Sequence, residues 1–140
     1  MGVRVLDSVE LPIRYEANIA EVRRSARSLA QSRGFDSFAT AALTTAASEL
    51  ARNVWVHGGG GSAVVEDLSD GQRSGVRMTF RDSGPGMSQA DLERALAGGF
   101  STARSLGLGL SGTRRLVDEF DIDTRPGAGT VVVITKWTRF

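Results

Sequence analysis

The sequence has no cysteine and only one histidine, and these two shortages remove several classes of function. A chain without cysteine forms no disulfide framework, no thiolate metal site and no cysteine nucleophile. Because His57 is alone, a histidine cluster is excluded as well. Any catalysis must therefore use carboxylates, hydroxyls, amides and arginines, together with an oxygen-bound hard cation such as Mg²⁺.

An excess of charge of one sign is also lacking. The 17 Lys and Arg residues nearly balance the 16 Asp and Glu residues, which leaves a net charge of +1 at pH 7. Such a chain has no broad positive field to neutralise many phosphates, so nucleic acid is disfavoured as a partner. Residues 1–14 alternate apolar and polar side chains and include Asp7 and Glu10, unlike a secretory signal. We therefore expect a cytoplasmic protein that does not bind membranes.

What is present is the composition of a globular protein, with 41% hydrophobic and 24% charged residues in 140 residues. This length predicts one domain over residues 1–140. Apolar periodicity, with four glycines at 58–61 ending the second helix, predicts helices over 16–33, 36–57 and 88–97 and from 110 onward. Strands are predicted within 3–13, 64–65, 76–80, 120–124 and 130–137. This order favours an α+β two-layer α/β sandwich, with helices on one face of a mostly antiparallel mixed sheet.

Two polar side chains border the apolar stripe of the second predicted helix. Glu49 and Asn53 lie one turn apart, next to the stripe that includes Leu43, Leu50 and Val54. A carboxylate and an amide in this position lose hydration unless something polar faces them. The pair indicates either a ligand site or the solvated polar edge of an amphipathic helix.

A turn of small residues follows the third predicted strand. Asp82 stands at the rigid strand end, and Gly84 and Gly86 flank a proline, which permits close approach of a ligand to the backbone. The Asp82 carboxylate is well placed to accept a hydrogen bond from an exocyclic amine. The alternative is an ordinary Asp/Gly/Pro turn.

A glycine-rich segment opens the last predicted helix. The backbone N–H groups of Gly107, Leu108 and Gly109 can face an anion at the helix start, and Arg104 can add a positive charge. The alternative is a glycine-rich surface loop with a solvated arginine. A Walker A loop is excluded, because the motif G-x-x-x-x-G-K-[ST] does not occur and Lys136 is the only lysine.

Taken in this order, the three motifs resemble the N box, G1 box and G2 box of the GHKL family of ATP-binding domains, which have the Bergerat fold. Residues 87–106 then correspond to the ATP lid. The resemblance covers nearly all of the chain. Within the family, segments 48–53, 98–102 and 118–130 are similar to the stressosome switch kinases of the RsbT type.

The resemblance implies a role for each motif residue. Asn53 is the expected Mg²⁺ ligand, Glu49 the base that orients and deprotonates a Ser/Thr hydroxyl, and Asp82 the acceptor of the adenine amino group. Thr130 is expected to support Asp82 through water. The other residues expected to bind the nucleotide are Gly84, Gly86, Arg104, Gly107, Leu108 and Gly109.

The resemblance also implies a function. The expected protein is an ATP- and Mg²⁺-dependent protein serine/threonine kinase of a bacterial stress-signalling, partner-switching module. It would phosphorylate STAS-domain scaffold or antagonist proteins and, once released, activate a downstream PP2C-type phosphatase. The alternatives are an anti-sigma-factor kinase of the same fold and a nucleotide-dependent protein-binding switch without kinase activity. A further alternative is ATP hydrolysis, in which water replaces the hydroxyl.

Overall fold

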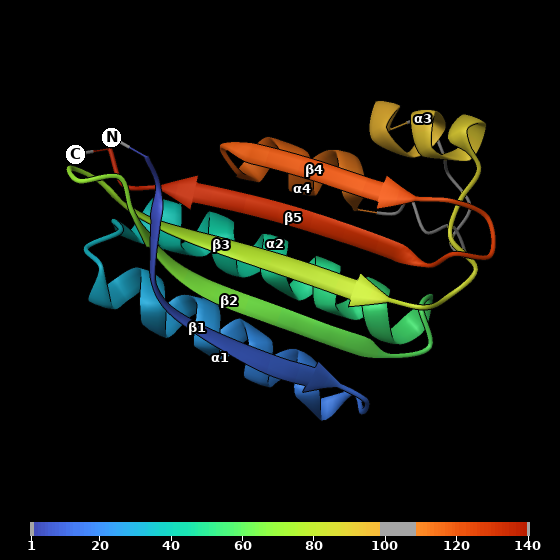
Figure 1. The fold of residues 1–140 in the computed structure, drawn as a ribbon, viewed down its shortest axis with the longest axis horizontal. Helices are drawn as coiled ribbons and strands as arrows, with labels where there is room; N and C mark the ends of the chain where they lie inside the picture. Colours follow the sequence, from blue (N-terminus) through green and yellow to red (C-terminus); the bar gives the residue numbers. More distant parts are fainter. Residues whose placement is uncertain (1, 99–108, 140) are drawn as a thin grey trace.

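The computed structural model describes residues 2–98 and 109–139. Within this part, the elements follow the predicted order of one strand, two helices, two strands, two helices and two strands (Figure 1). The elements are β1 (Arg4–Ile13), α1 (Ala17–Ser32), α2 (Ser37–Val56), β2 (Gly61–Ser69), β3 (Ser74–Asp82), α3 (Gln89–Ala97), α4 (Leu110–Leu116), β4 (Glu119–Thr124) and β5 (Thr130–Trp137).

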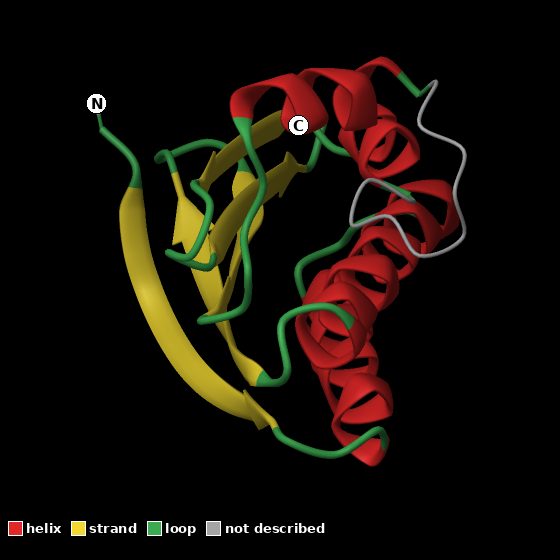
Figure 2. Cartoon of the chain, turned by 90° about the vertical axis from the view of Figure 1, so that its right-hand side faces the viewer, coloured by secondary structure: helices red, strands yellow, loops and turns green. Residues whose placement is uncertain are grey.

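The strands form one sheet in the order β1-β2-β3-β5-β4. All four pairings between described strands are antiparallel, so no parallel pair occurs among them. The helices cover one face of this sheet (Figure 2). The predicted α+β two-layer sandwich is therefore confirmed, with a described sheet that is antiparallel rather than mixed.

Strand β2 is longer than the sequence pattern predicts. The apolar pattern marks only residues 64–65, whereas the strand runs over nine residues, Gly61–Ser69. The pattern is hidden because the strand carries a buried charge: Asp67 is only 3% exposed and accepts two hydrogen bonds of 3.0 Å from Arg33 Nε. Arg33 lies just after α1, so this ion pair fastens the helix layer to the sheet.

The hydrophobic core lies between the sheet and helices α1 and α2. Its largest fully buried apolar side chains are Phe80, Ile13, Leu43, Leu50, Met78 and Ile134. None of the helices in the described residues is long and apolar enough to cross a membrane.

Helix α2 sets the position of the two polar residues predicted on it. The helix starts where the Asp36 side chain accepts a hydrogen bond of 2.7 Å from the Ala39 N–H, which is an N-cap. It ends at His57, whose N–H donates to the Asn53 carbonyl. Seven buried residues hold α2 against the sheet. As a result, the end of α2, the end of β3 and the start of β5 meet at the same edge of the fold (Figure 1).

The Arg33–Asp67 pair makes an asymmetric prediction for stability. Replacing Arg33 by Met leaves the buried Asp67 carboxylate without its cation, so we expect the thermal midpoint to fall by several degrees. Asp67→Asn should cost less, because the Arg33 side chain is 42% exposed and stays hydrated without a partner. Thermal unfolding followed by circular dichroism measures both. A larger fall for Asp67→Asn than for Arg33→Met would contradict this account.

Candidate active site

Side chains from α2, β3, α4, β4 and β5 line one small cavity of about 20 Å³. A cavity of this volume has room for about one water molecule, so a larger ligand enters only if the lining side chains move apart. The lining is mostly apolar with a few polar groups, as is usual for small-molecule sites. Its residues are Leu50, Asn53, Val54, Phe80, Asp82, Met87, Leu110, Ile122, Thr130 and Val132.

Asp82 is the central polar group of this cavity. It is the last residue of β3 and lies between Gly61 of β2 and Thr130 of β5 in the sheet register. Burial raises the pKa of its carboxyl, while hydrogen bonds from the backbone N–H groups of Gly84 and Thr130 and the nearby His57 oppose the rise. The Gly84 N–H donates to Asp82 Oδ1 at 2.9 Å. A half-buried carboxylate fixed in this way is suited to accept a hydrogen bond from a ligand in the cavity.

Gly58 is a site residue that the sequence analysis missed. A Cβ atom at this position would lie 2.4 Å from Asp82 Cγ, and one at Gly84 would lie 2.7 Å from Gly58 Cα. The end of α2 and the turn after β3 therefore pack in direct contact, with no room for a side chain. In the sequence, Gly58 belongs to a run of four glycines that indicates only a helix end, so nothing there points to Asp82.

A network of hydroxyl groups connects Thr130 to the turn after β3. The Thr130 and Thr124 hydroxyls are 2.9 Å apart, and the Thr124 hydroxyl donates to the Gly129 carbonyl at 3.1 Å. The same Thr124 oxygen accepts the Met87 N–H at 3.0 Å. Thr124 thus holds the segment after the turn against β4 and β5. No sequence signal marks Thr124, because a threonine in a strand is common and belongs to no motif.

Glu49 and Asn53 occupy neighbouring turns at the same edge of α2. Asn53 lines the cavity, whereas Glu49 lies beside the start of α4, at Gly109. A Cβ atom on Gly109, which has φ +86°, would come within 2.7 Å of Glu49 Oε2. Of the two alternatives for this pair, the structure favours the ligand site over the solvated helix edge. Asn53 faces the cavity, and Glu49 faces the start of α4.

The structure thus brings together most of the predicted site residues. Asn53, Asp82 and Thr130 line one cavity, and Gly84 and Gly86 lie in the turn that follows Asp82. The predicted residues Arg104, Gly107 and Leu108 lie outside the described residues.

The described residues hold no group of three or more His, Cys, Asp or Glu side chains that could bind a metal. Mg²⁺ characteristically keeps several waters and takes one or two protein oxygens together with substrate phosphates. The donor set that fits this pattern is the Asn53 amide, with the Glu49 carboxylate one turn away.

The chain is similar to known proteins over most of its length. A family model described as histidine kinase-like ATPase domain matches residues 11–136. The serine/threonine-protein kinase RsbT of Bacillus subtilis (strain 168) is 38% identical over 124 residues, which cover 89% of this chain and 92% of that protein. Among solved structures, a chain in the SiaB-SiaC complex from Pseudomonas aeruginosa gives a TM-score of 0.49 at 13% identity. That match covers 96% of this chain and 91% of the SiaB-SiaC chain.

The family match spans most of the sheet and the four helices of the described residues, and the RsbT match extends over nearly the full length of both proteins. The chain therefore belongs to the histidine kinase-like ATPase family and, within it, to the serine/threonine-protein kinases of the RsbT type.

Proposed function

We propose that this RsbT-type kinase is a cytoplasmic enzyme that uses ATP and Mg²⁺ to phosphorylate serine or threonine residues of STAS-domain scaffold or antagonist proteins. Once released from them, it activates a PP2C-type phosphatase in a stress response. The observation that carries the proposal is the convergence of Asn53, Asp82 and Thr130 on one cavity, with Glu49 one turn from Asn53. The identity to RsbT over most of both chains supports it.

Adenine recognition rests on Asp82. Its carboxylate accepts a hydrogen bond from the exocyclic amine of adenine, and Thr130, its neighbour across β3 and β5, supports it through a water molecule. Gly84 and Gly86 shape the pocket by letting the turn pack closely, since a Cβ would lie 2.7 Å from Gly58 Cα at the first and 1.9 Å from the Arg125 carbonyl oxygen at the second. Guanine carries a carbonyl oxygen where adenine carries the amine, so it would place an acceptor against the Asp82 acceptor. This mismatch favours ATP over GTP.

The phosphates extend from this cavity toward the start of α4. The Asn53 amide oxygen would hold Mg²⁺, which would supply charge neutralisation at the phosphates. Gly109 contributes a backbone N–H at the helix start, and Arg104, Gly107 and Leu108 are the further phosphate contacts that the sequence predicts. Glu49 lies at this end of the site, beside Gly109.

Phosphoryl transfer then requires mainly positioning and charge neutralisation. The substrate hydroxyl oxygen attacks the γ-phosphorus, its proton moves to a Glu49 carboxylate oxygen, and the bond from the γ-phosphorus to the bridging oxygen breaks to release ADP. The product carries a phosphate of about two negative charges beside Glu49. Once Glu49 releases the proton to solvent, repulsion between its carboxylate and the phosphate weakens the complex and frees the kinase for its next partner.

The first prediction concerns Asp82. Asp82→Asn replaces an acceptor oxygen with an amide that can present a donor to the adenine amine, so we expect ATP affinity to fall roughly ten-fold or more. Isothermal titration calorimetry measures this, with urea unfolding as the control for folding. The free energy of unfolding should change little. Burial disfavours the charged form of Asp82 in the folded protein, so replacing it with a neutral amide removes little stabilisation. Unchanged ATP affinity in the variant would falsify the adenine assignment.

The second prediction separates Glu49 from Asn53. Glu49→Gln removes the proton acceptor but keeps the shape, so ATP binding should be nearly unchanged while transfer of labelled phosphate to a STAS-domain substrate falls at least about a hundred-fold. Asn53→Ala should instead weaken Mg²⁺-dependent ATP binding. If Glu49→Gln transferred phosphate at the wild-type rate, Glu49 would not be the general base. A stable ATP-dependent complex of the wild type with no labelled partner would show a binding switch rather than a kinase.

The third prediction uses Gly58, which no motif identifies. Gly58→Ala places a methyl group against Asp82 Cγ and should displace the carboxylate, lowering ATP affinity roughly ten-fold. Gly112→Ala is the matched control, because a Cβ there meets no atom within 4 Å. Calorimetry on the two variants makes the comparison. Equal ATP affinities would show that the contact between Gly58 and Asp82 does not set the adenine pocket.

A further inference from the structure

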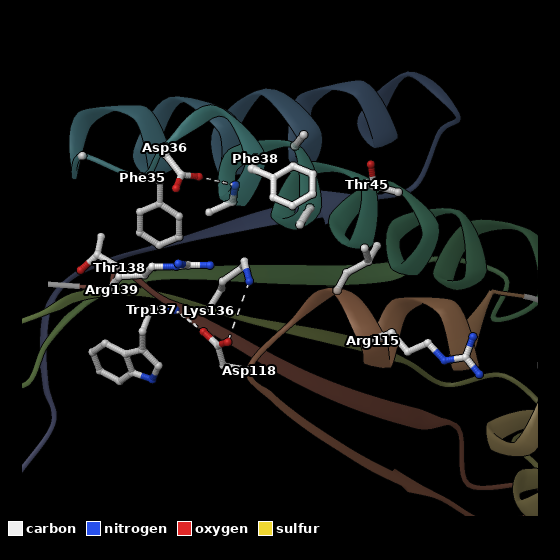
Figure 3. A pocket seen from close by; sticks show the side chains of 15 residues that line it. Phe35, Asp36, Phe38, Thr45, Arg115, Asp118, Lys136, Trp137, Thr138 and Arg139 are labelled. Carbon is white, nitrogen blue, oxygen red and sulfur yellow. Dashed lines mark hydrogen bonds and ion pairs between the residues drawn. The ribbon is translucent and has the colours of Figure 1, made fainter.

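The N-terminal half of α2 stands exposed between two hollows, away from the nucleotide cavity. One hollow, of about 860 Å³, lies between α2, the end of α4 and the end of β5 (Figure 3). The other, of about 480 Å³, lies between α1 and α2. Phe35, Ala41 and Thr45 line both, so this part of α2 forms a ridge with a hollow on each side.

The exposed side of this ridge is apolar and shallow. Phe38 is 85% exposed and stands at the start of a strip of small, mostly apolar side chains. Ala41, Ala42 and Thr45 follow at helical spacing on the same face, over about two turns or roughly 10 Å. Small side chains here let another helix approach α2 closely, and Phe38 supplies an apolar anchor beside them.

Positive charge borders the larger hollow on the side opposite α2. Arg115, Lys136 and Arg139 line it, with Lys136 between the two arginines in Figure 3. Within the described part of the chain, neither arginine forms an ion pair. The surface formed by Phe38, Ala41, Ala42, Thr45, Arg115, Lys136 and Arg139 is called the α2 docking surface below.

The two acidic groups at this hollow are already engaged within the chain. Asp36 Oδ1 accepts the Ala39 N–H at 2.7 Å and caps α2. Asp118 Oδ2 accepts the Trp137 N–H at 2.7 Å, and its Oδ1 lies 3.9 Å from Lys136 Nζ. The arginines therefore keep their charge available to a partner, and the α2 docking surface combines an apolar strip with a cationic border.

We infer that the α2 docking surface binds an acidic amphipathic helix of a partner protein. The apolar face of that helix packs on Phe38 and the small residues of α2, and its acidic edge faces Arg115 and Arg139. A helix fits because the small side chains of Ala41 and Ala42 let a second helix lie close to α2 beside the Phe38 anchor, and acidic residues fit because the border is cationic.

This surface is separate from the site of phosphoryl transfer. Phe38 and Glu49 lie 11 residues apart on the same helix, which corresponds to about 16 Å. A partner helix bound at Phe38 therefore leaves the nucleotide cavity open. Binding at the α2 docking surface is expected to proceed without ATP and without kinase activity, so the inference stands independently of the proposed function.

The test uses two fluorescein-labelled synthetic helical peptides of about 18 residues. One has leucines on one face and glutamates on its flanks, and its twin has lysines in place of the glutamates. Fluorescence anisotropy with the full chain should show the glutamate peptide binding roughly ten-fold tighter than the lysine peptide. Phe38→Ala and Arg115→Glu should each weaken it roughly five-fold or more.

The matched controls make the same kinds of substitution at residues outside the α2 docking surface. Tyr15→Ala removes a 71% exposed aromatic side chain elsewhere, and Arg24→Glu reverses an exposed charge on α1. Neither should change the affinity. Equal affinity for the two peptides, or the same loss in controls and test variants, would overturn the inference. So would a dimer, seen by sedimentation equilibrium, that Phe38→Ala dissociates, because the occupant would then be a second copy of the chain.

Two further measurements keep this inference distinct from the proposed function. Saturating ATP and the Glu49→Gln variant should both leave peptide affinity unchanged. Peptide binding that persists while phosphate transfer is absent would count against the kinase mechanism alone. Peptide binding abolished by Glu49→Gln would contradict a surface separate from the site.

Discussion

The site depends on one constraint, which is that the half-buried Asp82 carboxylate is held in a fixed position at the end of the central strand β3. Asp82 lies between β2 and β5, and Gly58 and Gly84 leave no space through which its side chain could move toward α2. Burial disfavours its charge, and two backbone N–H groups compensate only in part. The cavity beside it is lined mainly by apolar side chains, so a ligand that donates a hydrogen bond there gains from a group already fixed in direction.

Helix α2 connects this site to the rest of the surface. Its C-terminal half carries Glu49 and Asn53, and its N-terminal half carries Phe38 and the small residues of the α2 docking surface. Seven buried residues hold the helix on the sheet, and the Arg33–Asp67 pair fastens the end of the neighbouring helix to β2. The same helix, held firmly on the sheet, thus carries residues of the candidate active site at one end and the α2 docking surface at the other.

Much of this arrangement follows from the sequence, and the remainder depends on contacts between distant residues. Periodicity predicts the order of elements, and the positions of Glu49, Asn53 and Asp82 follow from a helix edge and a strand end. The length of β2 does not follow, because its buried Asp67 is compensated by Arg33, 34 residues away. The roles of Gly58 and Thr124 likewise depend on residues distant in the sequence, Asp82 and Met87. A glycine run and a strand threonine carry no signal of those neighbours.

The central claim is that the Asp82 carboxylate accepts a hydrogen bond from adenine, and a pH titration of this carboxyl by carbon-13 NMR tests it most directly. Without nucleotide, burial should place the pKa of Asp82 above the ordinary aspartate value of about 3.9. A donor from adenine stabilises the ionised form, so saturating ATP should lower this pKa. A pKa that ATP leaves unchanged, or raises, would contradict the account.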